Sequence, residues 1–391
     1  MTAIPNKQFT ARSMESVISP IVVAVSASVL LVLTSLTSGA QAQTDDVGLD
    51  FGASYEMGYQ AAPWGSDDGG SNKQRLTLNL SADTGKLFGL KNGTFFFQYQ
   101  NHTGEHGGNN IGDIQQFDGL DDPEYDRIHM LWYQHVFMDG KLRIKMGKVE
   151  PKSEFFAPKN AGNHLGFSTE RSPTILAQGP PSMSFNAFFS PTENFTLALG
   201  IYDATWNRGR DENTFKLYNF FKADDYAIFA EARYDWKAAS SGPGGGLKVG
   251  FWRLDGERNL FAGGQTDGTN GYYITLDQTI TASGIGVYAQ IGTADKKVSN
   301  LSRHIGAGMQ WVGPLKGREK DVFGLGVSTV KFSDAPGSPF LKGSETAYEI
   351  FYKAPITSWF TLQADGQMIS NPGGLGAENV FVSTFRGTLS F

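Results

Sequence analysis

Cysteine is absent from the 391-residue chain, which excludes a disulfide framework and any thiolate metal site. Blocks of basic residues are also absent, and the formal net charge is −6. A protein that binds nucleic acid by neutralising phosphates needs a basic surface, so this class of partner is not expected. Nothing in the composition calls for a cofactor.

Catalytic signatures are equally scarce. We find no G-x-S-x-G and no H-E-x-x-H motif, and the chain has only six histidines. His102 and His106 flank Glu105 in the stretch NHTGEHGG, but this Gly-rich stretch reads as a loop and lacks the helical geometry that would direct both rings at one metal ion. We therefore expect no metal site, and an outer-membrane enzyme remains only an alternative.

Long apolar runs are missing from the chain except near its start. The run IVVAVSASVLLVL, residues 21–33, follows Lys7 and Arg12 and precedes Ala40-Gln41-Ala42. This order of basic, apolar and small residues predicts a secretory signal peptide, residues 1–42, cleaved after Ala42. A membrane anchor is the alternative, but the run is shorter than the ~20 residues that span a bilayer.

The remaining chain, residues 43–391, is rich in glycine and aromatic residues and alternates between apolar and polar side chains. Its last residues, NVFVSTFRGTLSF, place Phe381, Phe385 and Leu389 on one face and Arg386 on the other. Similar segments predict sixteen strands, near 49–60, 73–84, 94–102, 126–137, 141–149, 182–190, 194–203, 226–236, 246–254, 271–281, 284–292, 302–312, 320–332, 344–354, 357–370 and 378–391.

Short and long connections alternate between these strands. Turns such as MDGK (138–141) contrast with long polar stretches such as 103–125, 150–181 and 255–270. This asymmetry is typical of outer-membrane barrels with short periplasmic turns and long extracellular loops. The sequence therefore predicts an all-β fold, a 16-stranded antiparallel transmembrane β-barrel in a Gram-negative outer membrane, with apolar faces on lipid and an aqueous lumen.

Alternation also predicts which side chains line the lumen. Strand 126–137 is left open, because Trp132 and Tyr133 cannot both face lipid. Elsewhere the charged residues expected to face inward are Glu56, Glu231, Asp235, Asp277, Glu345, Glu349 and Asp365, and equally many bases, Arg75, Arg143, Lys145, Arg233, Lys248, Lys353 and Arg386. Gln363 and Trp252 share this face. Balanced charges suit a neutral solute rich in hydroxyl groups, although any water-filled lumen needs paired charges to fold.

The longest loop, residues 150–181, follows the fifth predicted strand. Loops beyond ~15 residues in a compact fold are usually functional. Its apolar side chains would gain little from full solvation, so we expect it to fold into the pore; a packed extracellular lid is the alternative. Its candidate solute-binding residues are Glu154, Phe155, Lys159, Asn163 and Arg171. From the strands we add Arg143, Lys145, Glu231, Arg233, Lys248, Trp252, Glu349, Gln363, Asp365 and Arg386.

Several phrases resemble the carbohydrate-selective porin family, OprB, of Gram-negative outer membranes. They are residues 85–100, 127–156, 345–374 and the terminal FRGTLSF. The resemblance implies a 16-stranded barrel, usually a homotrimer in outer-membrane lipid, that passes glucose and other sugars into the periplasm. It carries over no specific sugar contact. A general diffusion porin, a porin for another small solute, and a purely structural barrel or adhesin remain alternatives.

Overall fold

The computed structural model describes residues 47–64, 70–105, 107, 111–205, 225–236, 244–280 and 284–391. Residues 50–391 form one compact unit, distinct from residues 1–49, and it is this unit that is described below. The predicted signal peptide, residues 1–42, lies outside the described residues, as does His106.

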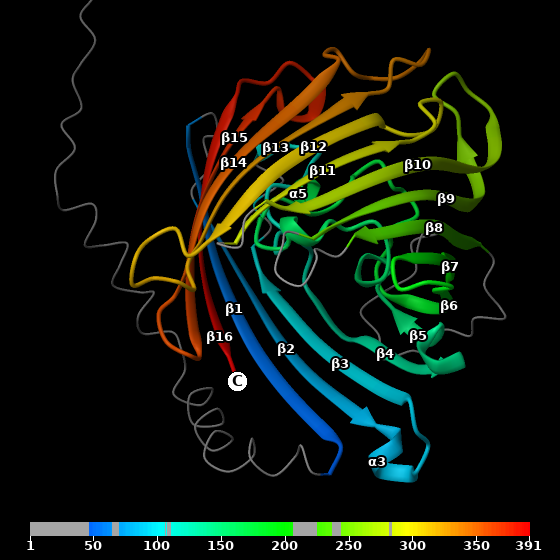
Figure 1. Cartoon of the computed structure of the whole chain (residues 1–391). Helices are drawn as coiled ribbons and strands as arrows, with labels where there is room; N and C mark the ends of the chain where they lie inside the picture. Colours follow the sequence, from blue (N-terminus) through cyan, green and yellow to red (C-terminus); the bar gives the residue numbers. More distant parts are fainter. Residues whose placement is uncertain are drawn as a thin grey trace, which may run out of the picture. The chain divides into compact units, whose positions relative to one another are not determined.

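The described residues form sixteen strands, each antiparallel to its neighbours, in one closed barrel (Figure 1). The predicted fold and strand number are therefore confirmed. The strands are β1 (Leu49–Trp64), β2 (Ser71–Asp83), β3 (Gly93–Gly104), β4 (Tyr125–Phe137), β5 (Leu142–Val149), β6 (Ser182–Phe189), β7 (Phe195–Asp203), β8 (Tyr226–Trp236), β9 (Gly245–Asn259), β10 (Gln265–Thr279), β11 (Ile285–Thr293), β12 (Leu301–Val312), β13 (Val322–Phe332), β14 (Ser344–Pro355), β15 (Phe360–Ser370) and β16 (Val380–Ser390).

The first and last strands close the barrel. Tyr55 of β1 lies opposite Leu389 of β16, and Tyr59 lies opposite Phe385. Next to this ladder the backbones of Ala53 and Phe391 exchange two hydrogen bonds, of 3.0 and 2.9 Å. The alternating terminal segment is therefore a barrel strand, and its backbone groups are paired on both sides.

One predicted loop is partly strand. The sequence suggested a long connection at 255–270, but β9 continues to Asn259 and β10 begins at Gln265. Arg258 pairs with Thr266, and Gly268, at a positive φ of 68°, lies where the register shifts. Residues on both faces of this hairpin are polar, so no apolar alternation indicated that the ladder continues.

Small helices occupy the connections. Between β2 and β3, α3 (Thr84–Phe88) is capped by the Asp83 carboxylate, which accepts from Gly85 N and Lys86 N, and ends at Gly89 in the left-handed region. The helix α5 (Phe167–Glu170) is a single turn within the longest loop. Among the described residues, no helix has both the length and the apolar content needed to cross a lipid bilayer.

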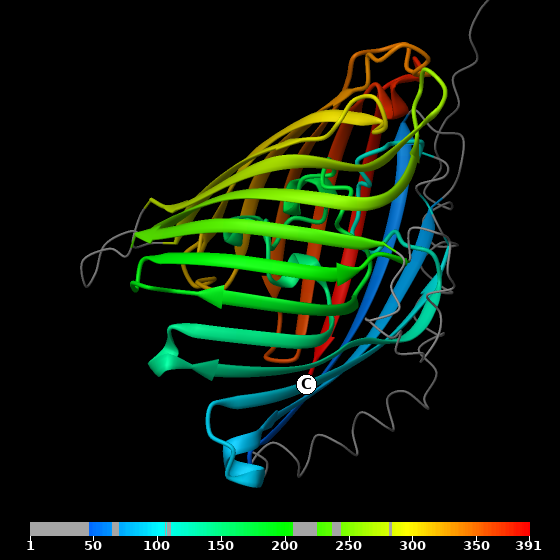
Figure 2. The ribbon, with the colours of Figure 1, turned by 90° about the vertical axis from the view of Figure 1, so that its right-hand side faces the viewer.

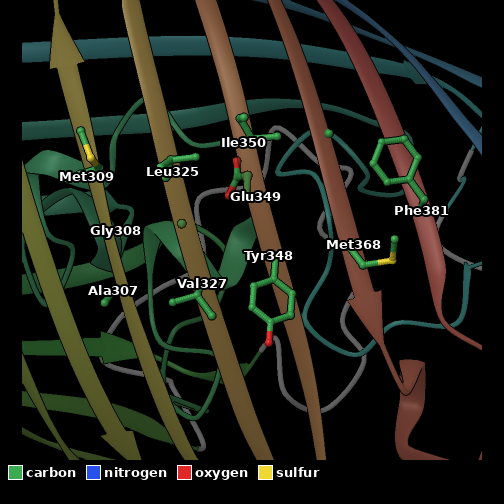
Figure 3. Close-up of a pocket in the computed structure, with 12 residues that line it drawn as sticks. Ala307, Gly308, Met309, Leu325, Val327, Tyr348, Glu349, Ile350, Met368 and Phe381 are labelled. Carbon is green, nitrogen blue, oxygen red and sulfur yellow. The ribbon is translucent and has the colours of Figure 1, made fainter.

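The outer face of the barrel is apolar. Tyr348 and Ile350 of β14 are 54% and 50% exposed, whereas Glu349 between them is buried on the inner side. A shallow hollow of about 620 Å³ crosses this face over β12–β16 (Figure 3). Its lining is almost wholly apolar, with Met309, Leu325, Val327, Met368 and Phe381 around it. No group of polar side chains converges there, so this hollow is not suited to a polar solute.

A bulge fixes the orientation of β4, which alternation had left open. Gln98 pairs with Met130 and Tyr99 with Ile128, so His129 is an extra residue in the ladder. Beyond the bulge, Trp132 faces inward with Lys145 Nζ 3.7 Å from its ring centre. Tyr133 lies opposite the outward-facing Met146. The bulge also allows Arg127 and His129 to be buried on the inner side, out of phase with Trp132.

The main apolar core lies inside the barrel rather than between two sheets. Phe155 of the longest loop stacks on Phe229 of β8 at 5.3 Å and packs against Phe188 of β6. Trp252 of β9 is fully buried in the same cluster. The loop thus lies within the lumen and packs its apolar side chains against the barrel wall.

A glycine on the inner wall leaves space for this loop. A Cβ at Gly326 of β13 would come within 2.7 Å of Thr169 Cγ2 and 2.9 Å of His164 Cε1. We expect Gly326→Val to lower the free energy of unfolding by about 1–3 kcal/mol, because the loop must shift. Gly343→Val is the control, since nothing lies within 4 Å of that position. Equal urea midpoints for the two variants, read by tryptophan fluorescence, would contradict the close contact.

Candidate functional site

Residues 150–181 run through the interior of the barrel (Figure 2). Carboxylates on the inner face of the wall accept hydrogen bonds from the backbone of this loop. Glu231 accepts from Phe156 N at 2.9 Å. Asp277 accepts from Lys159 N and Asn160 N at 3.0 and 2.8 Å. Glu349 accepts from Leu165 N and Gly166 N at 2.6 and 3.2 Å. Carboxylates of β8, β10 and β14 therefore bind backbone N–H groups of the loop.

Inward donors bind the carbonyl groups of the same loop. Lys248 Nζ donates to Ala157 O at 2.6 Å, and Gln363 Nε2 donates to Asn163 O at 2.8 Å. Gln290 Nε2 donates to Ser168 O and Thr169 O, both at 2.9 Å. Because the loop forms little regular structure, its buried polar groups need these side chains as partners.

Glu154, at the start of the loop, is bound from two sides. Arg143 donates to its carboxylate at 2.8 Å, and Lys145 forms a second, shorter ion pair. Arg233 donates to the Glu154 carbonyl and also pairs with Glu231. Burial alone would raise the pKa of Glu154, but Lys145 and Arg143 outweigh it and lower this pKa below its ordinary value. The carboxylate is thus charged in the folded protein at neutral pH.

A second polar cluster binds the middle of the loop. His164 Nδ1 lies 3.1 Å from Glu349 Oε2, and Thr169 Oγ1 donates to the same oxygen at 2.6 Å. Asn163 Nδ2 donates to Gln310 at 2.7 Å, and its oxygen accepts from Lys353 at 3.0 Å. Asp365 accepts from Gln367 at 3.0 Å.

The preceding long loop, residues 105–124, also enters this network, which the sequence had not suggested. Gly119 N donates to Leu165 O and Phe167 N donates to Gln116 O, each at 2.9 Å. Glu345 of β14 accepts from Ile114 N and Gln115 N, each at 3.1 Å. Asp118 forms an ion pair with Arg386 of β16. The two loops therefore bind each other inside the barrel. The sequence indicated only that this connection is long.

A polar cavity of about 610 Å³ remains between these loops and strands β2, β3, β4 and β16. Its lining combines both charge signs with amides and aromatic rings. It is formed by Arg75, Gln98, Gln100, Gly119, Asp122, Pro123, Glu124, Tyr125, Arg127, His129, Met130, Glu150, Lys152, His164, Leu165, Phe167, Glu170, Arg171, Gln178, Gly179, Pro180, Pro181 and Arg386.

Many of the charges around this cavity are paired. Arg75 binds Glu56 at 2.6 Å, and Lys152 binds Glu170. Arg171 Nη1 lies 3.6 Å from Glu150 Oε1. Burial would raise the pKa of Glu150, but His129, Arg171 and Lys152 outweigh it and lower this pKa. The cavity can therefore offer charge-assisted hydrogen bonds to hydroxyl groups without a strong net field for a free ion.

The structure places the candidate residues in different surroundings. Arg171 and Arg386 line the cavity. Nine candidates anchor the loop, either from the barrel wall or as part of the loop itself: Arg143, Lys145, Glu154, Glu231, Arg233, Lys248, Asn163, Glu349 and Gln363. Asp365 lies beside this network. Phe155 and Trp252 are in the apolar core. Lys159 is 73% exposed in its side chain and faces Asp235 at 3.4 Å. Solute contact by any of the fifteen stays a prediction.

Sequence reasoning missed much of the cavity lining. Tyr125, Arg127 and His129 lie on the strand whose faces the bulge had obscured. Lys152, Phe167 and Glu170 belong to the longest loop, but they are not among the solute-binding residues that the sequence suggested. If both possible face assignments for β4 are considered, one of them places Arg127 and His129 on the inner side. Nothing in the sequence singles out Lys152 and Glu170.

Metal-binding geometry is not found among the described residues, where no three His, Asp or Glu side chains are grouped to hold an ion. The ring nitrogens of His102 instead lie 2.9 Å from Leu120 O and 3.2 Å from Pro123 O. His102 thus helps to position loop 105–124.

Comparisons with known proteins agree with this architecture. The model of the family "Carbohydrate-selective porin, OprB family" matches residues 67–391. Porin B of Pseudomonas aeruginosa is 21% identical over 89% of this chain and 88% of its own length. The high-pH structure of Pseudomonas putida OprB has a TM-score of 0.82 at 19% identity, covering 90% of this chain and 96% of that one. Its low-pH structure has a TM-score of 0.60 at 16% identity, covering 94% and 98%. The chain belongs to the OprB family of carbohydrate-selective porins.

Proposed function

We propose that this porin lets neutral sugars such as glucose diffuse passively across the outer membrane through the cavity beside residues 150–181. The observation that carries the proposal is the lining of that cavity, in which both charge signs, amides and aromatic rings surround about 610 Å³. Carboxylates accept from sugar hydroxyls, guanidinium groups donate to sugar oxygens, and aromatic rings contact ring C–H groups. The family and the closed barrel are those of a channel.

The proposed mechanism needs weak binding. A sugar leaves bulk water, exchanges some of its hydration for the lining groups, and leaves on the other side down its concentration gradient. A tight site would block conduction, so each contact must be individually modest. Paired charges such as Arg171 with Glu150 meet this requirement, because each is already partly satisfied before the solute arrives. No cofactor or energy source enters this scheme.

The cellular setting is part of the proposal. Residues 1–42 would direct secretion and be removed, and the apolar outer face, with Tyr348 and Ile350, would contact outer-membrane lipid. A homotrimer rests on the family resemblance alone. Mass spectrometry of the mature N-terminus measures the cleavage site, and a start other than residue 43 would contradict the predicted signal peptide. Mass spectrometry of the intact detergent complex measures the oligomeric state, and a monomeric mass would contradict the homotrimer.

Planar-bilayer conductance of the refolded protein tests the function. We expect small, steady channels that glucose blocks with saturation, while inorganic phosphate at the same concentration does not. Open channels whose current is not reduced by glucose would support a general diffusion porin instead, and block of the current by phosphate would indicate an anion pore. Protein that is folded in the membrane yet forms no channel would contradict a porin altogether.

A further inference from the structure

Two arginines of the cavity lie over aromatic rings, one on the loop and one on the barrel wall. The Arg171 Cζ atom lies 3.7 Å from the centre of the Phe167 ring, and Arg127 Cζ lies 3.9 Å from that of Tyr125. All four residues line the same cavity. We propose that Phe167 and Tyr125 are positioning residues, which orient the two guanidinium planes as hydrogen-bond donors to a sugar ring. This inference rests on the proposed function.

Local structure builds the loop pair. Phe167 begins the single turn of α5 and Arg171 follows its end, so the two are four residues apart and their side chains meet on one face. Phe167 N is bound by Gln116 O at 2.9 Å, and Arg171 N donates to Phe167 O at 3.0 Å. The backbone of both residues is thus fixed, and only the long arginine side chain needs a further constraint.

The wall pair has a different local basis. Tyr125 and Arg127 are two residues apart on β4, so both face the lumen before the bulge at His129. The Tyr125 hydroxyl donates to Gln100 Oε1 at 2.9 Å, and its ring stacks on His102 at 5.1 Å. The Tyr125 ring is held at its hydroxyl by Gln100 and on one face by His102, so it offers Arg127 a rigid support.

Orientation is what a planar donor needs. A guanidinium group donates within its plane, so two N–H groups reach adjacent hydroxyls only if that plane is correctly directed. An unsupported arginine samples many rotamers, and its ordering on binding opposes affinity. The aromatic ring removes part of this freedom beforehand. Glu150 near Arg171 reduces the net charge of the donor, which favours neutral hydroxyls over phosphate.

The test compares Phe167→Leu, which keeps apolar bulk without a ring, with Phe167→Tyr, which keeps the ring. We expect Phe167→Leu to raise the glucose concentration for half-block of the bilayer current about three- to tenfold. Phe167→Tyr should stay within about twofold of wild type. Phe340→Leu is the matched control, because Phe340 also stacks on an aromatic ring, Phe332, but lies in the β13–β14 loop outside the cavity.

A double-mutant cycle separates positioning from general loosening. Arg171→Lys keeps the charge and loses the planar donor, so it should weaken block as Phe167→Leu does, and the double variant should be no weaker than either single one. Three results would each overturn the inference. They are additive losses of glucose block in the double variant, wild-type block in Phe167→Leu, and equal losses of block in the Leu and Tyr variants together with raised conductance. Failure of glucose to block the wild-type channel would overturn the proposed function together with it.

Discussion

Replacing residues 157–166 with a short Gly-Ser linker is expected to raise single-channel conductance at least about twofold and to abolish saturable block by glucose. These residues include the backbone donors to Asp277 and Glu349, together with His164. Without them the wall carboxylates face water, the lumen widens, and the cavity loses one of its sides. The measurement is single-channel recording in planar bilayers, with and without glucose.

A matched replacement distinguishes this loop from loops in general. Exchange of residues 334–343, between β13 and β14, for the same linker removes a comparable length that does not line the cavity. Its conductance and glucose block should match wild type. If the 157–166 variant is folded, as judged by heat-dependent mobility on gels, and yet conducts as wild type does, then this loop does not restrict the pore.

Glu154→Ala is expected to lower the free energy of unfolding by about 3–5 kcal/mol, because it leaves buried cations without their shared anion. In the Lys145–Glu154 pair the side chains are only 8% and 6% exposed. Lys159→Ala is the control, since the side chains of its pair with Asp235 are 73% and 43% exposed, and such pairs contribute about 0–1 kcal/mol. Urea titrations in detergent measure both; equal midpoints for the two variants would show that Glu154 does not anchor the loop.

The charged Glu154 carboxylate should make the free energy of unfolding depend on pH in the acid range. Its pKa is lowered in the folded protein from an ordinary value of 4.5, so the stabilisation is present above pH 4.5 and is lost as the pH falls below it. The stability of wild type relative to Glu154→Gln should therefore shrink between pH 5 and the acid range, because the amide cannot titrate. Parallel stability curves for the two proteins over this range would contradict a charged Glu154.

How far the sequence predicts this molecule depends on what decides each feature. The strands were predictable because lipid on one side and water on the other impose alternation, as in Tyr348, Glu349 and Ile350. The orientation of β4 was not, because the inserted His129 changes the parity within the strand. The β9–β10 hairpin was underestimated because both of its faces are polar at the far end.

The cavity itself was harder to predict for a related reason. Alternation shows that Glu231 and Glu349 face inward, but it does not show what they bind. Both satisfy backbone N–H groups of the loop, which have no partner in regular structure. The position of the loop therefore decides which inward-facing charged side chains bind the loop and which remain free to bind a solute. That position depends on Phe155 packing against Phe229, a contact between distant parts of the chain.

The pairing of β1 with β16 has a consequence for biogenesis. The hydrogen bonds between Ala53 and Phe391 continue the pairing of β1 with β16, two strands far apart in the sequence, so the ladder cannot close until β16 has left the ribosome. Until that moment two strand edges stay open, each a template for pairing with another molecule. Closure is also the contact with the largest loop entropy to overcome. Translation and secretion of β16 must therefore precede closure of the barrel, and the open edges need protection until then.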